Sequence, residues 1–299
     1  MRNILFIPLT IIVLSLIVIN CNTNKHSEYI NGALHIIDCL LVFHTDSAYK
    51  LLINIESKVD SIDDKKISMR YLKALADAQN KLYLDMMPDS IFENVVNFYD
   101  EFGTYNDRIK CHYLLGCIYR DNGQAPMALK CYKEAIDLIE YDNADIDYRV
   151  VMSIFGQMGE IFYKQYFLNE AIDSYKKYSL FALKSGDLYN YIRGVEFQIQ
   201  PYLLLSDTNM VYLLTDSAYN LYLKNNMPDK AVRTFPTILY LYIEKQDFIK
   251  SKEIIDKFEK ESGLFDKDGN IDSLYARFFY AKGLYYLGID KDDSAEYFF

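Results

Sequence analysis

Residues His112 to Ala135 read HYLLGCIYRDNGQAPMALKCYKEA, and this stretch decides the fold. It places small and aromatic side chains at Gly116, Tyr119, Ala128 and Tyr132. Apolar residues recur at helical spacing on both sides of the polar segment DNGQAP, which is typical of a turn. The stretch therefore predicts two amphipathic helices that fold back on each other as an antiparallel hairpin.

The same spacings recur at two other places in the chain. One copy has Gly159, Phe162, Ala171 and Tyr175, and the other has Gly283, Tyr286, Ala295 and Phe299. A glycine on the first helix lets the second helix approach closely, and an alanine fits at the crossing where a larger side chain would overlap. We expect the aromatic side chains to fill the gap toward the next hairpin.

This spacing resembles the tetratricopeptide repeat, whose pattern is W-x2-L-G-x2-Y followed by A-x3-F over about 34 residues. His112, Phe155 and Phe279 stand at the tryptophan position, and the terminal proline of the pattern is absent. The resemblance implies an all-α, right-handed superhelical solenoid of about seven antiparallel helix hairpins. The alternative is a plain helical bundle, which does not require glycine and alanine at fixed offsets.

Hairpins of decreasing similarity cover residues 29–299. A looser copy has Phe235, Leu239, Tyr242, Ser251 and Ile255, with leucine in place of glycine and serine in place of alanine. Pro201 interrupts the first helix of another hairpin. The clear repeats lie near 109–142, 152–185 and 276–299, the looser one at 232–262, and degenerate ones at 29–58, 67–102 and 187–224.

In this family the first helices line a concave groove that holds partner peptides. The corresponding positions in this sequence are Lys110, Tyr113, Arg120, Glu160, Tyr163, Lys164, Arg233, Tyr240, Arg277 and Tyr280. Tyrosine and arginine often carry binding energy at interfaces. Basic and aromatic residues along the groove predict a protein or peptide partner with acidic or carboxylate groups. The alternative is that these residues are ordinary exposed side chains.

Composition and charge exclude several classes of protein. Hydrophobic residues make up 51% of the 299 residues, while glycine and proline number 12 and 6, which favours helices over a β fold with many tight turns. The formal net charge is −10, and no cluster of Lys and Arg provides the electrostatic footprint that phosphate backbones need. We therefore expect no binding of nucleic acid by this segment.

The N-terminus resembles a secretory signal. Arg2 precedes an almost continuous apolar run, shorter than the roughly 20 residues of a spanning helix, and Cys21 follows it. This resembles the lipobox of bacterial lipoproteins, although Asn20 replaces the usual small residue. We expect a signal peptide at 1–20, lipidation of Cys21, a polar tether at 21–28 and an extracytoplasmic location; an uncleaved anchor is the alternative.

Catalytic and metal motifs are absent from the sequence. The four histidines lie apart, at His26, His35, His44 and His112, and the remaining cysteines Cys39, Cys111, Cys117 and Cys131 match no metal-binding spacing. No glycine-rich phosphate loop or nucleophile elbow occurs. The sequence therefore predicts a non-enzyme without a cofactor or metal, and it leaves any disulfide pairing open.

Two acidic patterns have both a structural and a functional interpretation. Asp266–Tyr275 places oxygen ligands at alternate positions, but the order does not match a calcium loop, so a polar turn capped by Asp272 is favoured. Asp-Ser-aliphatic triplets begin at Asp46, Asp60, Asp89, Asp216, Asp272 and Asp293. They predict helix caps, and they also resemble the O-glycosylation signal of exported Bacteroidetes proteins.

The last residues, GLYYLGIDKDDSAEYFF, stop inside the second helix of a hairpin. Because a solenoid end normally has a polar capping helix, we expect the last repeat to be incomplete and the natural protein to continue. The chain resembles extracytoplasmic tetratricopeptide lipoproteins of Bacteroidetes. This resemblance implies a non-catalytic scaffold that binds a protein or peptide on the cell envelope; the alternative is the sensor region of a longer membrane-anchored signalling protein.

Overall fold

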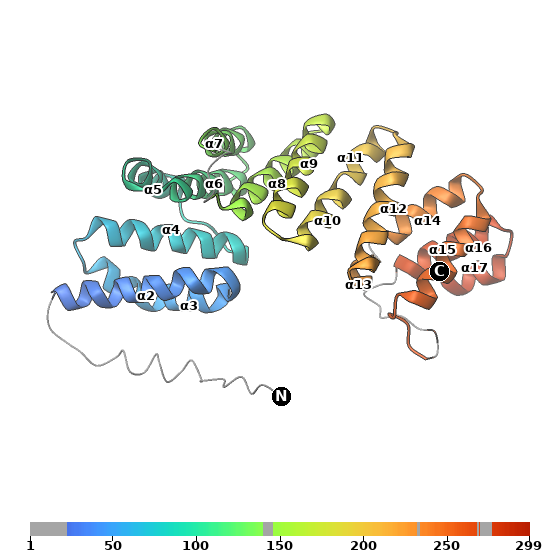
Figure 1. Cartoon of the computed structure of the whole chain (residues 1–299), viewed down its shortest axis with the longest axis horizontal. Coiled ribbons are helices and arrows are strands. Elements are labelled where there is room, and N and C mark those ends of the chain that lie inside the picture. Colours follow the sequence, from blue (N-terminus) through green and yellow to red (C-terminus); the bar gives the residue numbers. More distant parts are fainter. Residues whose placement is uncertain (1–22, 140–145, 232–233, 268, 270–276) are drawn as a thin grey trace. The chain divides into compact units, whose positions relative to one another are not determined.

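A computed structural model describes residues 23–139, 146–231, 234–267, 269 and 277–299. The chain divides into two compact units, Met1–Ile146 and Asp147–Phe299, and each is considered by itself. In both units helices follow one another with short turns (Figure 1). The predicted signal peptide at 1–20, Cys21 and Arg233 lie outside the described residues, as does Asp272.

The described residues of unit 1 form three helical hairpins. Their pairs are α2 (Thr23–Phe43) with α3 (Thr45–Asp60), α4 (Lys65–Leu82) with α5 (Asp89–Phe102), and α6 (Tyr105–Asp121) with α7 (Ala125–Asp137). Buried aliphatic side chains such as Leu34, Leu52 and Ile67 join the first two hairpins in one apolar cluster. Because α2 begins at Thr23, most of the predicted polar tether at 21–28 is helical.

In unit 2 the residues that the structure describes form four hairpins and one further short helix, α13. The helices are α8 (Tyr148–Lys164), α9 (Leu168–Lys184), α10 (Leu188–Phe197), α11 (Ile199–Leu204), α12 (Thr208–Lys224), α13 (Pro228–Ala231), α14 (Phe235–Glu244), α15 (Phe248–Glu261), α16 (Arg277–Gly288) and α17 (Asp292–Phe298). Rings of Phe235, Phe258 and Phe278 pack together with centroids 4.7–5.3 Å apart. This aromatic contact joins α14, α15 and α16 into one core.

Pro201 divides the first helix of the second hairpin in unit 2. The break lies at Gln198, between α10 and α11. Pro201 therefore lies in the first turn of α11, where backbone N–H groups have no partner within the helix, so its missing N–H costs no hydrogen bond. Gln198 is buried, and its Nε2 donates to the Gly194 carbonyl at 2.9 Å. The interruption predicted from Pro201 is therefore a break between two short helices, α10 and α11, that both pack on α12 and together form one arm of the hairpin.

The repeat positions pack in the same way in the hairpins that match the pattern. The small residue of the second helix is fully or almost fully buried at Ala128, Ala171, Ser251 and Ala295. The aromatic residue one turn later lies over the glycine of its own hairpin, in the pairs Gly116–Tyr132, Gly159–Tyr175 and Gly283–Phe299. This corrects the expectation that these rings point toward the next repeat, although Tyr175 also contacts Phe197 of the next hairpin, with centroids 5.3 Å apart. The predicted all-α array of antiparallel helix hairpins is confirmed.

In the part of the chain that the structure describes, the Asp-Ser-aliphatic triplets do not supply the N-caps that the sequence predicted. Asp216 lies in the middle of α12, and Asp46, Asp89 and Asp293 lie inside first turns whose N-cap is another residue. Aspartates that stand at the N-cap position and accept backbone N–H groups there include Asp64, Asp147, Asp187, Asp207 and Asp247. Capping by aspartate is therefore frequent, but at positions before the helices rather than in the triplets.

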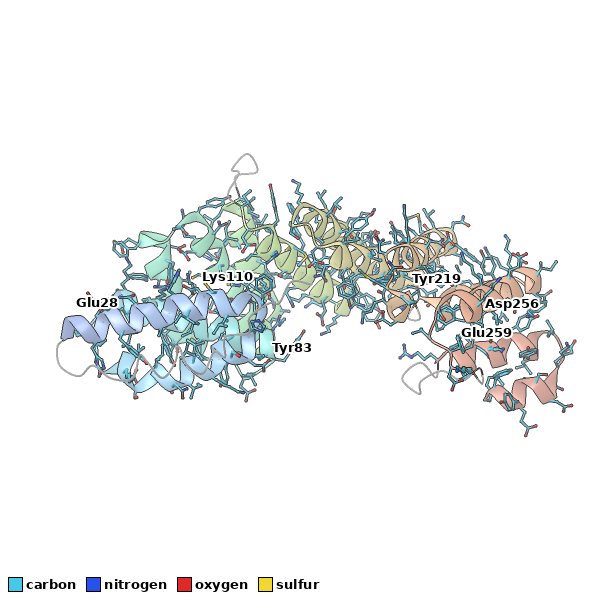
Figure 2. All side chains as sticks on the ribbon, turned by 60° about the horizontal axis from the view of Figure 1, so that its bottom comes forward. Glu28, Tyr83, Lys110, Tyr219, Asp256 and Glu259 are labelled. Atoms are coloured by element: carbon cyan, nitrogen blue, oxygen red, sulfur yellow. The ribbon has the colours of Figure 1, made fainter. Side chains whose placement is uncertain are left out.

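Bulky residues occupy left-handed backbone at several hairpin turns. Tyr83, between α4 and α5, has φ 56° and is 95% exposed (Figure 2). Tyr166, between α8 and α9, has φ 62° and is also exposed. By contrast, Gly123 supplies the left-handed residue between α6 and α7. Left-handed backbone costs an L-residue with a side chain about 1–2 kcal/mol, so Tyr83 and Tyr166 are strained positions.

Candidate functional site: the faces of the first helices

In unit 1 the predicted groove residues are held in contacts within the protein. Lys110 Nζ lies 2.8 Å from Asp77 Oδ1 of α4 (Figure 2 shows Lys110). Arg120 pairs with Asp121 at 2.7 Å and donates to Asn80 Oδ1 at 3.2 Å. Tyr113 is buried, so it cannot present its ring to a partner, and its place in the predicted groove is corrected. Its hydroxyl accepts a hydrogen bond from Asn80.

Asp77 is the centre of this polar network. It is buried on α4, between Lys110 of α6 and Lys81 one turn further along α4, whose Nζ lies 3.1 Å away. Burial by itself raises the pKa of this carboxyl, but the two ammonium groups outweigh that effect and hold the pKa below its usual value. Asp77 is therefore a charged residue that joins the first helices of two neighbouring hairpins.

Further ion pairs continue across the first helices of unit 1. Arg70 of α4 contacts Asp38 of α2 at 2.5 Å, and Lys73 of α4 pairs with Asp107 of α6. Opposite charges from neighbouring helices thus face each other along this surface. The basic character that the sequence predicted for the groove is therefore neutralised at the described positions of unit 1.

In unit 2 the predicted groove residues are more exposed. Glu160 and Lys164 are exposed and pair with each other at 2.7 Å. Tyr163 is half-buried, while Tyr240 and Tyr280 are 52% and 60% exposed. Arg277, another predicted groove residue, is also exposed. These side chains come from the first helices α8, α14 and α16, so the face of the first helices offers aromatic surface in this unit.

A cavity of about 180 Å³ lies on this face of unit 2. Its walls come from the first helices of three successive hairpins, α8, α10 with α11, and α14, with one ring from α9. The lining residues are Tyr163, Tyr175, Glu196, Phe197, Ile199, Gln200, Pro201, Thr234 and Thr237. Gln200 is exposed at its edge, while Tyr175, Ile199, Pro201 and Thr234 are buried. The cavity is large enough for a side chain of a bound partner.

Glu196 and the aromatic rings set the chemistry of this cavity. The Tyr222 hydroxyl donates to Glu196 Oε2 at 2.7 Å, and Arg193 Nη1 lies 3.4 Å from both carboxylate oxygens. The Arg193 guanidinium also lies 4.3 Å from the centre of the Phe197 ring. Burial, together with the nearby Glu160 and Tyr163, raises the pKa of Tyr175, so its hydroxyl stays neutral. The cavity therefore combines a carboxylate, neutral hydroxyls and ring faces.

The sequence missed the residues of α10 and α11 in this site. Ile199, Val211 and Thr215 have the same mutual spacing as Gly116, Ala128 and Tyr132, and all three are buried. This spacing places Glu196 and Gln200 on the same face as the predicted groove residues. The signal was present in the sequence, but Pro201 hid it, because a proline inside a helix pattern normally marks an end.

His112, which stands at the tryptophan position of the repeat, is a structural residue. It is half-buried, with Nε2 3.1 Å from Asp100 of α5 and Nδ1 3.4 Å from Glu134 of α7. It therefore bridges the second helices on either side of α6. Over the described part of the chain, no group of three His, Cys, Asp or Glu residues is placed to hold a metal ion.

Three solved structures share this arrangement over most of their length. The apo form of the quorum sensor NprR from B. thuringiensis has a TM-score of 0.55 at 14% identity, covering 97% of this chain and 82% of that one. Aspartyl phosphate phosphatase F from Bacillus subtilis has a TM-score of 0.54 at 12% identity, covering 94% and 84%. BtubC (BKLC) from P. vanneervenii has a TM-score of 0.53 at 10% identity, covering 77% and 88%. No protein-family model and no curated protein matches the sequence.

The chain has a tetratricopeptide-like fold. The glycine–aromatic contacts within the hairpins account for the repeat spacing in physical terms. At 10–14% identity the similarity concerns the fold alone. The tetratricopeptide-like face of the first helices, with its cavity in unit 2, is therefore the candidate site on geometric grounds.

Proposed function

We propose that this protein is a non-catalytic scaffold that binds a protein or peptide segment along the first helices of unit 2. The observation that carries the proposal is the cavity of about 180 Å³, whose walls come from three successive hairpins. A site made by several repeats suits an extended segment that crosses them. Exposed rings at Tyr240 and Tyr280 on later first helices would extend the contact surface.

The test selects peptides that bind the purified protein and then measures their affinity for a variant whose cavity is filled. Gln200→Trp adds a large ring at the exposed edge of the cavity, where it should not disturb the core. We expect peptides selected on the native protein to lose at least tenfold in affinity for Gln200→Trp. Lys176→Trp, on an exposed position of α9, is the matched control and should leave affinity unchanged. Equal binding to all three proteins would contradict the proposed site.

We also propose that the protein is attached to a bacterial membrane through a lipid on Cys21. The support is the sequence alone: a charged start, a short apolar run and the cysteine directly after it. No helix among the described residues is long and apolar enough to cross a membrane. Labelling with a radioactive fatty acid in a bacterial host should mark the native protein and not Cys21→Ser. Equal labelling of both would contradict the anchor.

The sensor region of a longer signalling protein is the second candidate. Its support is that the quorum sensor NprR has the same fold over most of its chain, although at 14% identity. In that case peptide binding should change the structure around the cavity. Hydrogen exchange with and without a selected peptide would measure this, and protection confined to the contact residues favours the scaffold.

A further inference from the structure

We infer that the outer face of α2 is a membrane-contact surface that holds unit 1 flat against a lipid bilayer. This inference rests on the lipid attachment proposed above and adds a second point of contact. α2 packs on α3 and α4 through its other side. The residues of the outer face are exposed and recur at intervals of three and four positions: Gly32, Ile36, Cys39 and Phe43. They therefore form one stripe along the helix.

The stripe ends among further exposed apolar side chains at one edge of unit 1. Phe43, the last residue of α2, is 78% exposed, and Tyr83 and Leu84 are exposed directly after the end of α4. Lys81 Nζ of α4 donates to the Leu41 carbonyl of α2 at 2.8 Å, which holds these two helix ends together. Exposed apolar side chains that gather from several elements mark a contact with a protein or a membrane.

The conformation of Tyr83 supports a role for its ring outside the fold. Its backbone is left-handed, with φ 56°, and this strain is not repaid by packing, because the side chain is almost fully exposed. Strained residues of this kind persist most often at functional sites. Tyrosine is also enriched at membrane interfaces, because its ring is apolar and its hydroxyl reaches water. A contact between Tyr83 and lipid accounts for both observations.

The position of Cys21 in the chain favours a membrane as the occupant of this face. Cys21 precedes Thr23, the first residue of α2, by two positions, so a lipid on Cys21 would place the start of α2 at the membrane surface. α2 has 21 residues and is about 30 Å long, with Phe43 at its other end. Figure 2 shows Glu28 near the start of α2 and Tyr83 beyond its end. A helix parallel to the bilayer brings both ends into contact, and tethering at one end makes weak contacts at the other sufficient.

The distribution of charge is consistent with a lipid surface. The chain has 42 Asp and Glu residues and a formal net charge of −10, which anionic lipid head groups would repel. In the described stretch from Asn31 to His44, however, no exposed residue carries a carboxylate. Asp38 in this stretch is half-buried and paired with Arg70. The outer face of α2 can therefore approach a bilayer with little of this repulsion.

The test places a single tryptophan on this face, because the native chain contains none. Phe43→Trp is the reporter, and Phe102→Trp, an exposed ring at the end of α5, is the matched control. Each full chain is produced in a bacterial host and reconstituted into vesicles of phosphatidylethanolamine and phosphatidylglycerol, with or without bromine on the acyl chains. Bromine quenches a tryptophan that reaches the acyl chains. We expect at least twofold quenching of Phe43→Trp and none of Phe102→Trp.

Two further variants of the Phe43→Trp chain show whether the face acts as a unit. Ile36→Ser with Tyr83→Ser removes two exposed apolar side chains from the face and should reduce the quenching at least by half. Ile91→Ser with Phe102→Ser removes an exposed isoleucine and an exposed ring from α5 and should leave the quenching unchanged. All four positions are exposed, so the substitutions should preserve the fold. Equal quenching in the two variants would overturn the inference.

Other outcomes separate this inference from the proposed function. Fatty-acid labelling at Cys21 without quenching of Phe43→Trp would leave the lipid attachment in place and overturn the contact surface. Cys39 is exposed, whereas Cys111, Cys117 and Cys131 are buried. Disulfide-linked dimers through Cys39 on the vesicles, without quenching, would show that a second copy covers this face, and would also overturn the inference. Loss of labelling or of peptide binding, measured as described above, concerns the proposed function alone.

Discussion

Gly116 of α6 lies directly against the ring of Tyr132 of α7, so closely that a Cβ on Gly116 would be 2.3 Å from Tyr132 Cε1. Tyr132 is fully buried, and its hydroxyl donates to Cys117 Sγ at 3.6 Å. Glycine at this position is therefore a steric requirement of the hairpin.

Gly116→Ala should destabilise the protein by about 1–3 kcal/mol, because the added methyl group overlaps a buried ring. Gly32, inside α2, is the matched control, since a Cβ there meets nothing within 4 Å. Gly32→Ala should instead stabilise the helix by about 0.5–1 kcal/mol. Urea unfolding of both variants measures the difference. If both substitutions lower the free energy of unfolding, or both raise it, the steric interpretation is wrong.

Ala171→Glu should loosen or unfold unit 2. Ala171 is fully buried where α9 crosses α8, so the substitution places an unpaired carboxylate at a helix crossing, at a cost of several kcal/mol. Lys176→Glu, on the exposed side of the same helix, is the control and should change stability by less than about 0.5 kcal/mol. Thermal unfolding followed by circular dichroism compares the two. An unchanged melting curve for Ala171→Glu would contradict the repeat alignment.

The stability of unit 1 should fall in acid because of Asp77. Its pKa in the folded state is held below the value of about 3.9 expected in the unfolded chain. The stabilisation is therefore fully present above pH 4 and is lost as the pH falls through the lower, folded-state pKa. Asp77→Asn should remove roughly 3 kcal/mol at pH 7, because it breaks a buried pair with Lys110 and Lys81.

The slope of the unfolding free energy between pH 4 and pH 2 checks the role of Asp77. Asp77→Asn should flatten that slope compared with the native protein. Asp63→Asn, at an exposed position in the turn before α4, serves as the control and should keep the native slope. A native slope in Asp77→Asn would show that other groups cause the loss of stability in acid.

Tyr83→Gly should stabilise the protein by about 0.5–1 kcal/mol. The backbone at Tyr83 is left-handed, with φ 56°, which glycine adopts without a steric penalty, and the 95% exposed ring loses little packing. The greater entropy of glycine in the unfolded chain removes part of this gain. Tyr83→Phe keeps the strain and should be neutral. Loss of stability in Tyr83→Gly would indicate that the ring makes a contact that compensates for the strain.

The fold could be predicted because its determinants are local in the sequence. Gly116, Ala128 and Tyr132 lie in one hairpin, and their spacing is visible without knowledge of any other helix. The burial and pairing of the predicted groove side chains could not be predicted in the same way. Burial of Tyr113 and pairing of Lys110 depend on Asn80 and Asp77, which lie on a neighbouring hairpin.

The cavity was missed for a related reason. Its carboxylate, Glu196, lies on an arm that Pro201 divides, so the pattern of the first helix was lost at that point. The buried residues Ile199, Val211 and Thr215 restore the spacing once the arm is known to continue. Side chains that meet across repeats carry no periodic signal of their own in a single sequence.

The contact between Gly116 and Tyr132 joins residues only sixteen positions apart, and the equivalent pairs in other hairpins have the same separation. Short separations keep the entropy of loop closure small, and chains dominated by such contacts fold quickly. Each hairpin can thus close before its neighbours dock, and docking can spread in either direction from the first one formed. For this protein the order of assembly is set by which hairpin closes first, so hydrogen exchange during refolding should protect α6 with α7 and α8 with α9 before the hairpins without a glycine–aromatic pair.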